Sequence, residues 1–250
     1  MRYNKNMCTF KDRRAVIIGG SGGIGARVAR LLAREGAALT VHGGSDSARF
    51  AALCAELAAS VPVQPLTQRF SAALLPQLES SAVYDAVRSA DILCVCTGPF
   101  LQKPLDRMSC ADWIDVAALN YTLPGCLVSA ALPHMQEKRW GRIMLMGGTR
   151  THVINAFRTN AAYGGAKTAV CSLVKSVAAS YAAFGISCNA VLPGFTDTEY
   201  QPDSLKAVLA RKMPTGAMIA PEAIAEAVLF LLKTPEINGA LLNVDAGWVP

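Results

Sequence analysis

The chain has 250 residues, of which 52% are hydrophobic and only 17% are charged, and its formal net charge is +6. This length and composition fit one large α/β domain, residues 1–250, whose strands are buried on both faces as in parallel sheets. The basic residues are spread along the chain instead of forming a patch, and no stretch is long enough to span a membrane without charges or glycines, which argues against a nucleic-acid partner and against a membrane protein.

Repeated strand–helix units are indicated by short apolar runs that alternate with longer amphipathic ones. We expect helices at about 26–34, 48–60, 111–136, 161–184 and 221–232, with strands at 15–18, 39–42, 61–66, 91–96, 142–146, 187–192 and 240–244. This order predicts a doubly wound parallel sheet of about seven strands with helices on both faces. The segment at about 195–220 is rich in Pro, Gly and Thr and is the candidate for a mobile lid.

A glycine-rich run, Ile18-Gly-Gly-Ser-Gly-Gly-Ile-Gly25, follows the first expected strand and opens the first helix. Glycines in this context let the backbone approach a pyrophosphate, whose charge is stabilised by the helix N-terminus. The alternative is a tight strand-to-helix turn that binds nothing. The spacing is Gly-x-x-x-Gly-x-Gly rather than Gly-x-Gly-x-x-Gly.

Tyr163 and Lys167 lie four residues apart on the helix expected at 161–184, so their side chains project from the same face. An ammonium beside a phenol favours the phenolate, because opposite charge stabilises the ionised form and lowers the phenol pKa. The pair therefore predicts a tyrosine that exchanges protons near neutral pH. Together with the upstream glycine run, it suggests hydride-transfer chemistry.

The cysteines, in contrast, predict no metal site. There are eight, with no Cys-x-x-Cys pair, and Cys94 and Cys96 stand in an apolar run typical of buried small side chains. Unpaired thiols and the lack of a secretory segment predict a reducing, cytoplasmic location.

With these motifs in this order, the chain resembles the short-chain dehydrogenase/reductase family over nearly its whole length, and most closely the 3-oxoacyl-(acyl-carrier-protein) reductases. The other matching segments are Asn120 and the runs at 112–116, 141–143, 189–194, 221–225 and 238–247. The resemblance implies a Rossmann-type sheet and an NAD(P)-dependent oxidoreductase.

The resemblance assigns roles to residues of this chain. Tyr163 would be the general acid, Lys167 would lower the phenol pKa and hold the nicotinamide ribose, and Asn120 would support a water-mediated proton relay to Lys167. The residues implied in cofactor binding are Gly19, Ser21, Gly22, Gly23, Ile24, Gly25, Gly43, Ser45, Thr97, Gly98, Tyr163, Lys167, Pro193, Gly194, Thr196 and Thr198. For Thr196 a plain structural role in the turn is an open alternative.

Three positions depart from the family pattern. Ile18 stands where Thr is usual, and Val95-Cys-Thr-Gly98 replaces the usual Asn-Asn-Ala-Gly. Gly148 falls in the place of the catalytic serine, a loss comparable to removing an oxyanion-hole donor. Thr149 is adjacent and is the candidate substitute, while Thr151 lies two residues further on.

Cofactor choice depends on the end of the second expected strand, where an acidic residue would select NAD(H). Gly43 occupies that position, which leaves room for a 2′-phosphate that Ser45, His42 or Arg49 would meet, and NADP(H) is expected to be preferred over NAD(H). Asp46 would reverse this preference if it occupied the acidic position instead. No acidic residue follows the third expected strand to contact the adenine.

The function expected from these features is NADPH-dependent reduction of a small-molecule ketone or a 3-oxoacyl thioester, including one carried by acyl carrier protein. The alternatives are another oxidoreductase of the family, acting on a secondary alcohol, a sugar or an enoyl group, and a dinucleotide-binding protein that has lost catalysis. The resemblance also implies a homotetramer packed through the helices at 111–136 and 161–184. On the second of these, Ala169, Val170, Leu173, Val177 and Ala178 have a spacing that fits either core or interface.

Overall fold

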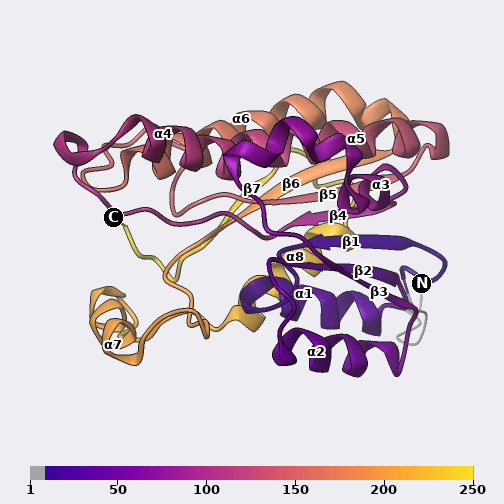
Figure 1. Cartoon of the computed structure of the whole chain (residues 1–250), viewed down its shortest axis with the longest axis horizontal. Helices are drawn as coiled ribbons and strands as arrows, with labels where there is room; N and C mark the ends of the chain where they lie inside the picture. The colour runs from indigo at the N-terminus through magenta and orange to yellow at the C-terminus, as the bar shows by residue number, and fades with distance from the viewer. Residues whose placement is uncertain (1–8, 250) are drawn as a thin grey trace.

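The sheet is the centre of the fold (Figure 1). In the computed structural model, which describes residues 9–249, seven parallel strands are ordered β3-β2-β1-β4-β5-β6-β7. The strands are β1 (Arg14–Ile18), β2 (Ala38–Gly43), β3 (Val63–Thr67), β4 (Ile92–Val95), β5 (Gly141–Met146), β6 (Ile186–Pro193) and β7 (Leu241–Val244). The predicted doubly wound sheet is confirmed. β3 is the strand at one edge, and the Pro65 within it is tolerated there because an edge strand leaves one side without ladder hydrogen bonds.

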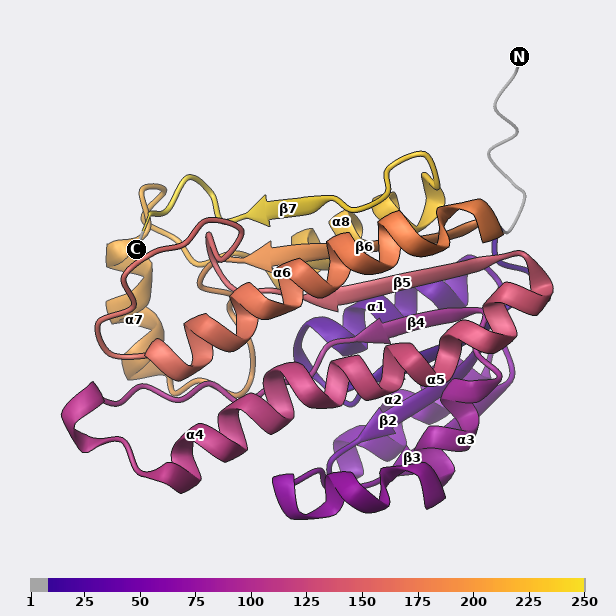
Figure 2. The ribbon, with the colours of Figure 1, turned by 90° about the horizontal axis from the view of Figure 1, so that it is seen from above.

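Helices cover both faces of this sheet (Figures 1 and 2). One face packs against α1 (Gly23–Arg34), α2 (Ala48–Ala58) and α8 (Pro221–Lys233), and the other against α3 (Ala82–Arg88), α5 (Leu123–Lys138) and α6 (Ala161–Tyr181). The central strands are buried on both sides, with every residue of β4 and β5 buried. This double burial explains why these strands have continuous apolar sequences rather than alternating ones.

Two stretches of the chain contain helices that the sequence analysis did not predict. The stretch between β3 and β4 forms a 3₁₀ helix, η1 (Ala72–Ser80), followed by α3, and neither was predicted. The proposed lid segment at 195–220 contains the helix α7 (Asp203–Lys212) rather than loop alone. At the lid's base, Thr196 pairs with Ile219 in an isolated parallel bridge.

The long helix expected at 111–136 is present but is not regular. It begins as α4 (Cys110–Ala117), passes through a π-helical turn, η3 (Ala118–Thr122), and continues as α5. A capping box formed by Ser109 and Asp112 fixes its start. The whole of Cys110–Lys138 is long and apolar enough to cross a membrane, but 56% of its most apolar window is buried within the fold, as in the core helix of a soluble domain.

The carboxyl ends of the strands all lie at one edge of the sheet. The chain order reverses between β1 and β4, since β1 pairs with β2 on one side and with β4 on the other. In doubly wound sheets the loops at such a reversal part and leave a crevice in which ligands bind. The glycine-rich run and the Thr97-Gly98 segment leave the sheet at this point.

Candidate active site

The glycine-rich run forms the turn from β1 into α1. Gly19 has a φ of +77°, and a Cβ placed on it would lie 3.0 Å from the backbone N of Thr97. A Cβ on Gly25 would collide with the carbonyl oxygen of Gly19. The absence of side chains at these two positions therefore lets the loop after β4 and the first turn of α1 pack directly against the loop after β1.

His42, at the end of β2, supports this loop from beneath. Its Nδ1 accepts a hydrogen bond from Gly19 N at 3.2 Å, its Nε2 donates to the carbonyl of Gln68 at 2.8 Å, and its ring stacks on Phe70. Burial lowers the pKa of His42, so the ring is neutral. The expectation that His42 would meet a 2′-phosphate was wrong, since the side chain is buried and both ring nitrogens are bonded.

Gly43 and Ser21 pack against each other at the same corner. A Cβ on Gly43 would lie 3.0 Å from Ser21 Cβ and 3.2 Å from the ring of Phe50. An acidic side chain at this position would have to displace both neighbours. Beyond it, Ser45 and Asp46 are exposed, and Ser47 caps α2 by accepting from Phe50 N.

Two of the groups predicted to act together, Asn120 and Lys167, converge at Gly98. Gly98 has a φ of +149°, and a Cβ on it would collide with Asn120 Oδ1 and lie 3.0 Å from Lys167 Nζ. The Asn120 side chain is fully buried in the π-helical turn, and its Nδ2 donates to the carbonyls of Pro99 and Val116 at 3.0 and 3.1 Å. Within residues 9–249, Asn120 Oδ1 has no hydrogen-bond partner.

The ionisation of the Tyr163–Lys167 pair differs from the sequence expectation. Lys167 is 3% exposed, its Nζ donates to the carbonyl of Met146 at 2.9 Å, and it lies 5.7 Å from the Tyr163 ring centroid. Burial lowers the pKa of Lys167 to about 8 and raises the pKa of Tyr163 to about 12. The prediction of a depressed phenol pKa is wrong for this arrangement, because desolvation outweighs an ammonium that is bonded to β5 instead of to the phenol.

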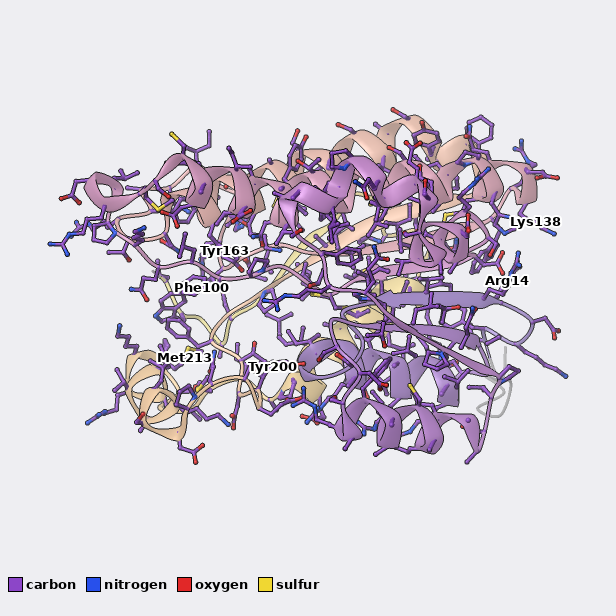
Figure 3. The ribbon with its side chains drawn as sticks, in the orientation of Figure 1. Arg14, Phe100, Lys138, Tyr163, Tyr200 and Met213 are labelled. Atoms are coloured by element: carbon purple, nitrogen blue, oxygen red, sulfur yellow. The ribbon has the colours of Figure 1, made fainter. Side chains whose placement is uncertain are left out.

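Phe100 is a site residue that the sequence analysis missed. Its ring meets the Tyr163 ring edge-on, with centroids 5.0 Å apart and an interplanar angle of 80°. Figure 3 shows the two rings together above the lid segment that carries Tyr200 and Met213. Its signal in the sequence was an apolar aromatic residue directly after the Thr97-Gly98-Pro99 turn, and in the structure it is 59% exposed.

Gly148 and its neighbours occupy the end of β5. A Cβ on Gly148 would lie 3.2 Å from Thr151 Cγ2 and 3.4 Å from Lys167 Cβ, so the position faces the lysine stem. The buried Thr151 is bonded back to Gly148, accepting from its N at 3.1 Å and donating to its carbonyl at 2.9 Å. Thr149 donates to the carbonyl of Pro193 at 2.6 Å. The hydroxyl that contacts the end of β6 is therefore that of Thr149 and not that of Thr151.

The end of β6 brings the remaining predicted residues to the same edge. Gly194 packs against Asp245, and Thr196 is buried with its hydroxyl donated to the Gly194 carbonyl at 3.0 Å, a contact that serves the turn itself. Thr198 approaches Gly23, on which a Cβ would lie 3.6 Å from Thr198 Cγ2. Among the described residues no group of three or more His, Cys, Asp or Glu side chains gathers as metal ligands would.

An acidic side chain from the lid segment also reaches the glycine-rich run. Glu199 Oε1 accepts a hydrogen bond from Gly23 N at 2.9 Å, at the first residue of α1. The sequence gave no indication of this contact, because the two residues are 176 positions apart.

Known proteins match this chain over nearly its whole length. The family described as enoyl-(acyl carrier protein) reductase matches residues 19–249. The chain is 33% identical to cis-4-hydroxycyclohexanecarboxylate dehydrogenase of Sinomonas cyclohexanicum, covering 96% of this chain and 97% of the relative. It is 32% identical to the 3-oxoacyl-[acyl-carrier-protein] reductase FabG of Vibrio harveyi, covering 93% and 96%. A solved short chain dehydrogenase/reductase family protein superposes with a TM-score of 0.83 at 28% identity, covering 96% and 98%.

The lowered pKa of Lys167 predicts a specific pH dependence of stability. Between about pH 8 and 10.5 the unfolded chain keeps a proton that folded Lys167 has lost, so the free energy of unfolding gains from this group as pH rises, by at most about 1.4 kcal/mol per pH unit. We expect the free energy of unfolding of the wild type minus that of Lys167→Met to become more positive between pH 8 and 10, measured by urea denaturation.

The exposed Lys175 on the same helix provides the control variant, Lys175→Met, for which the difference is expected to stay flat. Because the charge of Lys167 acts on the pKa of the neighbouring Cys96 and Cys171 thiols, the wild type and both variants are compared in a background in which these two cysteines are replaced by alanine. A flat profile for Lys167→Met would show that burial does not lower the Lys167 pKa.

Proposed function

Since the chain belongs to the short-chain dehydrogenase/reductase family and is an NAD(P)-dependent enzyme, we propose that it reduces the carbonyl of a ketone or 3-oxoacyl thioester with NADPH. The observation that carries this proposal is the convergence of Asn120 Oδ1 and Lys167 Nζ on Gly98, one helical turn from a Tyr163 that is protonated at neutral pH. When bound, the nicotinamide supplies the hydride.

The roles of the side chains follow from their ionisation. Tyr163, with a pKa of about 12, carries its proton at neutral pH and donates it to the substrate carbonyl oxygen as negative charge develops there. Lys167, with a pKa of about 8, supplies positive charge beside the resulting phenolate. Asn120 Oδ1, a buried acceptor that faces the same point, holds the proton path toward Lys167.

The residues at the edge of the sheet fit a dinucleotide. The N–H groups at the start of α1 and the bare glycine backbone would hold the phosphates. Thr97 and Gly98 would hold the middle of the cofactor, and Tyr163, Lys167, Pro193 and Gly194 its nicotinamide end. Gly19, Ser21, Gly22, Gly23, Ile24, Gly25, Gly43, Ser45, Thr196 and Thr198 complete the proposed set.

A preference for NADP(H) is supported by the corner at Gly43. No carboxylate stands there to bind a ribose diol, and an acidic side chain would clash with Ser21 and Phe50. The exposed Ser45 and Arg49 lie beyond this corner, where a 2′-phosphate would be met by charge-assisted hydrogen bonds.

Thr149 is the proposed replacement for the serine absent at Gly148. Its hydroxyl leads toward the end of β6, beside the position proposed for the nicotinamide, and is bonded only to a carbonyl, which leaves its oxygen able to accept and its proton able to turn toward a substrate oxygen. One such donor contributes a factor of about 10²–10³ to turnover in other enzymes.

The substrate is proposed to be apolar around its carbonyl. Phe100, Leu105 and Ile154 present exposed apolar side chains near Tyr163 or on the two loops that flank it. The segment at 195–220 would close over the substrate as a lid, and an acyl chain carried by acyl carrier protein or coenzyme A fits this surface.

Oxidation of a secondary alcohol is the second candidate, because one relative is a dehydrogenase of a hydroxylated ring acid. It is the same reaction in reverse, and it requires Tyr163 to act as a base. The raised pKa of Tyr163 keeps it near neutral pH in the protonated form that reduction requires.

We also propose a cytoplasmic homotetramer. The described cysteines, residues 54, 94, 96, 110, 126, 171 and 188, are all free thiols, as a reducing compartment would keep them. Of the α6 residues considered for an interface, Val170, Val177 and Ala178 belong to the core. On the helical segment expected at 111–136, Trp113 and Ile114 of α4 and Tyr121 of the π-helical turn are exposed. These apolar side chains form the surface proposed for contact between subunits.

Tyr163→Phe should abolish reduction of acetoacetyl-CoA. The substitution keeps the ring and its contact with Phe100 but removes the transferred proton, so we expect kcat to fall by a factor of about 10²–10⁴ or more. The measurement is NADPH oxidation in the presence of acetoacetyl-CoA, with Tyr181→Phe at the far end of α6 as the matched control.

The same assay tests Thr149. Thr149→Val, which keeps the shape and removes the hydroxyl, should lower kcat with little change in KM for NADPH. Unchanged turnover by Tyr163→Phe would refute its role as the acid. Tight NADPH binding without turnover on any carbonyl would favour a non-catalytic dinucleotide-binding protein.

NADPH should bind about tenfold more tightly than NADH, the effect of one charged hydrogen bond to the 2′-phosphate. Arg49→Gln should reduce the ratio of the two Kd values, measured by titration calorimetry. Arg30→Gln, which removes a charge on the neighbouring α1, should leave that ratio unchanged. A wild-type protein that binds both cofactors equally would contradict the preference.

Light scattering on the purified protein should give the mass of four chains. A monomer at micromolar concentration would overturn the proposed tetramer.

A further inference from the structure

The N-terminus of α1 is capped by a residue from the lid. Gly22 precedes the helix without a capping side chain, and the first turn contains no acidic residue. The acceptor is instead Glu199, whose Oε1 takes the hydrogen bond of Gly23 N at 2.9 Å. A carboxylate in this position is stabilised by the helix dipole and by an N–H group that has no partner within the helix.

Two arginines reinforce this contact. Arg27 Nη1 lies 3.9 Å from Glu199 Oε2, and Arg49 Nη1 lies 3.5 Å from Glu199 Oε1. Burial alone would raise the pKa of Glu199, but the bond from Gly23 N and the charges of Arg27 and Arg49 lower it below its ordinary value. Glu199 is thus an ionised carboxylate that is stabilised by the N-terminus of α1 and by two guanidinium groups.

Tyr200 extends the cover over the glycine-rich run. Its hydroxyl accepts from Arg49 Nη2 at 3.2 Å, and the guanidinium carbon lies 5.0 Å from its ring centroid. A Cβ on Gly22 would lie 3.0 Å from Tyr200 Cζ and 2.6 Å from Glu199 Oε1. The two lid residues therefore occupy the space directly above the glycine backbone.

We propose that Glu199 is a determinant of cofactor affinity that competes with the cofactor's phosphates for the N-terminus of α1. The inference rests on the proposed function, in which those phosphates bind at the glycine-rich run. A phosphate oxygen and the Glu199 carboxylate have the same charge and accept the same hydrogen bond, so both cannot be bonded to Gly23 N at once. Binding of the dinucleotide displaces the Glu199–Tyr200 segment from the run.

The surroundings allow this displacement. Glu199 also lines a hollow of about 400 Å³ that it shares with Arg27, Thr198 and Lys206. The segment is held on both sides, by the Thr196–Ile219 bridge before it and by the ion pair of Lys206 with Asp197 at 2.6 Å. Residues 198–202 can thus move between two fixed points while the rest of the lid keeps its place.

Glu199→Gln tests the competition by the sign of its effect. The variant keeps the size of the side chain but removes its charge, so the closed position loses stability and a larger fraction of the protein is open to the cofactor. We expect the Kd for NADPH, measured by titration calorimetry on the full chain, to fall by about tenfold. Tyr200→Phe, which loses only the bond from Arg49, should shift it in the same direction by less.

The matched control is Glu222→Gln. Glu222 also pairs with Arg27, at 3.0 Å, but the hydrogen bond of Gly23 N goes to Glu199. Its Kd for NADPH should stay within about threefold of wild type, as for an exposed ion pair.

An unchanged or raised Kd for Glu199→Gln, with wild-type protein that binds NADPH, would overturn the competition and leave the proposed function intact. A raised Kd would show that Glu199 supports the bound state. Failure of both proteins to bind either NADPH or NADH would overturn the proposed function and this inference together.

Discussion

The spacing between the two halves of the proposed site is set where β1 and β4 end. The loops after these strands leave the sheet in opposite directions, and they touch where the bare backbone of Gly19 meets Thr97. One loop carries the N-terminus of α1, and the other leads through Gly98 to Asn120 and Lys167. His42 holds the first loop from below through its bond to Gly19 N. Because these contacts are between backbone atoms or buried groups, the phosphate end and the proton-transfer end are fixed relative to each other before any ligand arrives.

The parts of the fold that the sequence predicted are those with the strongest burial. The runs at 92–96 and 143–146 are apolar throughout because β4 and β5 are covered on both faces, which is typical of central strands in a parallel sheet. The segment of η1 and α3 escaped prediction because it is short and partly exposed and contains Pro76. The sequence did not predict α7 because Pro, Gly and Thr residues surround it. It did not predict the π-helical turn because the apolar pattern continues across that turn.

In the candidate site, residue spacing predicted which side chains lie on one face, but it did not predict their ionisation or their hydrogen-bond partners. The four-residue interval predicted that Tyr163 and Lys167 share a face. The direction of their pKa shifts is set by desolvation on burial, which for Lys167 outweighs the opposite effect of the Cys96 and Cys171 thiols. The sequence also showed that the position of the catalytic serine is occupied by Gly148. Only the structure shows that the hydroxyls of Thr149 and Thr151 bond to different partners. Contacts such as Glu199 with Gly23 depend on the path of the whole chain and have no local pattern.

The π-helical turn at Ala118–Thr122 lies between α4 and α5 and sets how the two helices are rotated relative to each other. Val116 before it and Leu123 and Leu127 after it are all buried. The Val116 carbonyl accepts from the side chain of Asn120, which stabilises the opened backbone at that point. Adding or removing one residue on either side would rotate the flanking halves by about 100° relative to each other and turn apolar side chains toward water. Asn120, whose Oδ1 lies beside Lys167 Nζ at Gly98, is thus also the residue whose side chain bonds the opened backbone between α4 and α5.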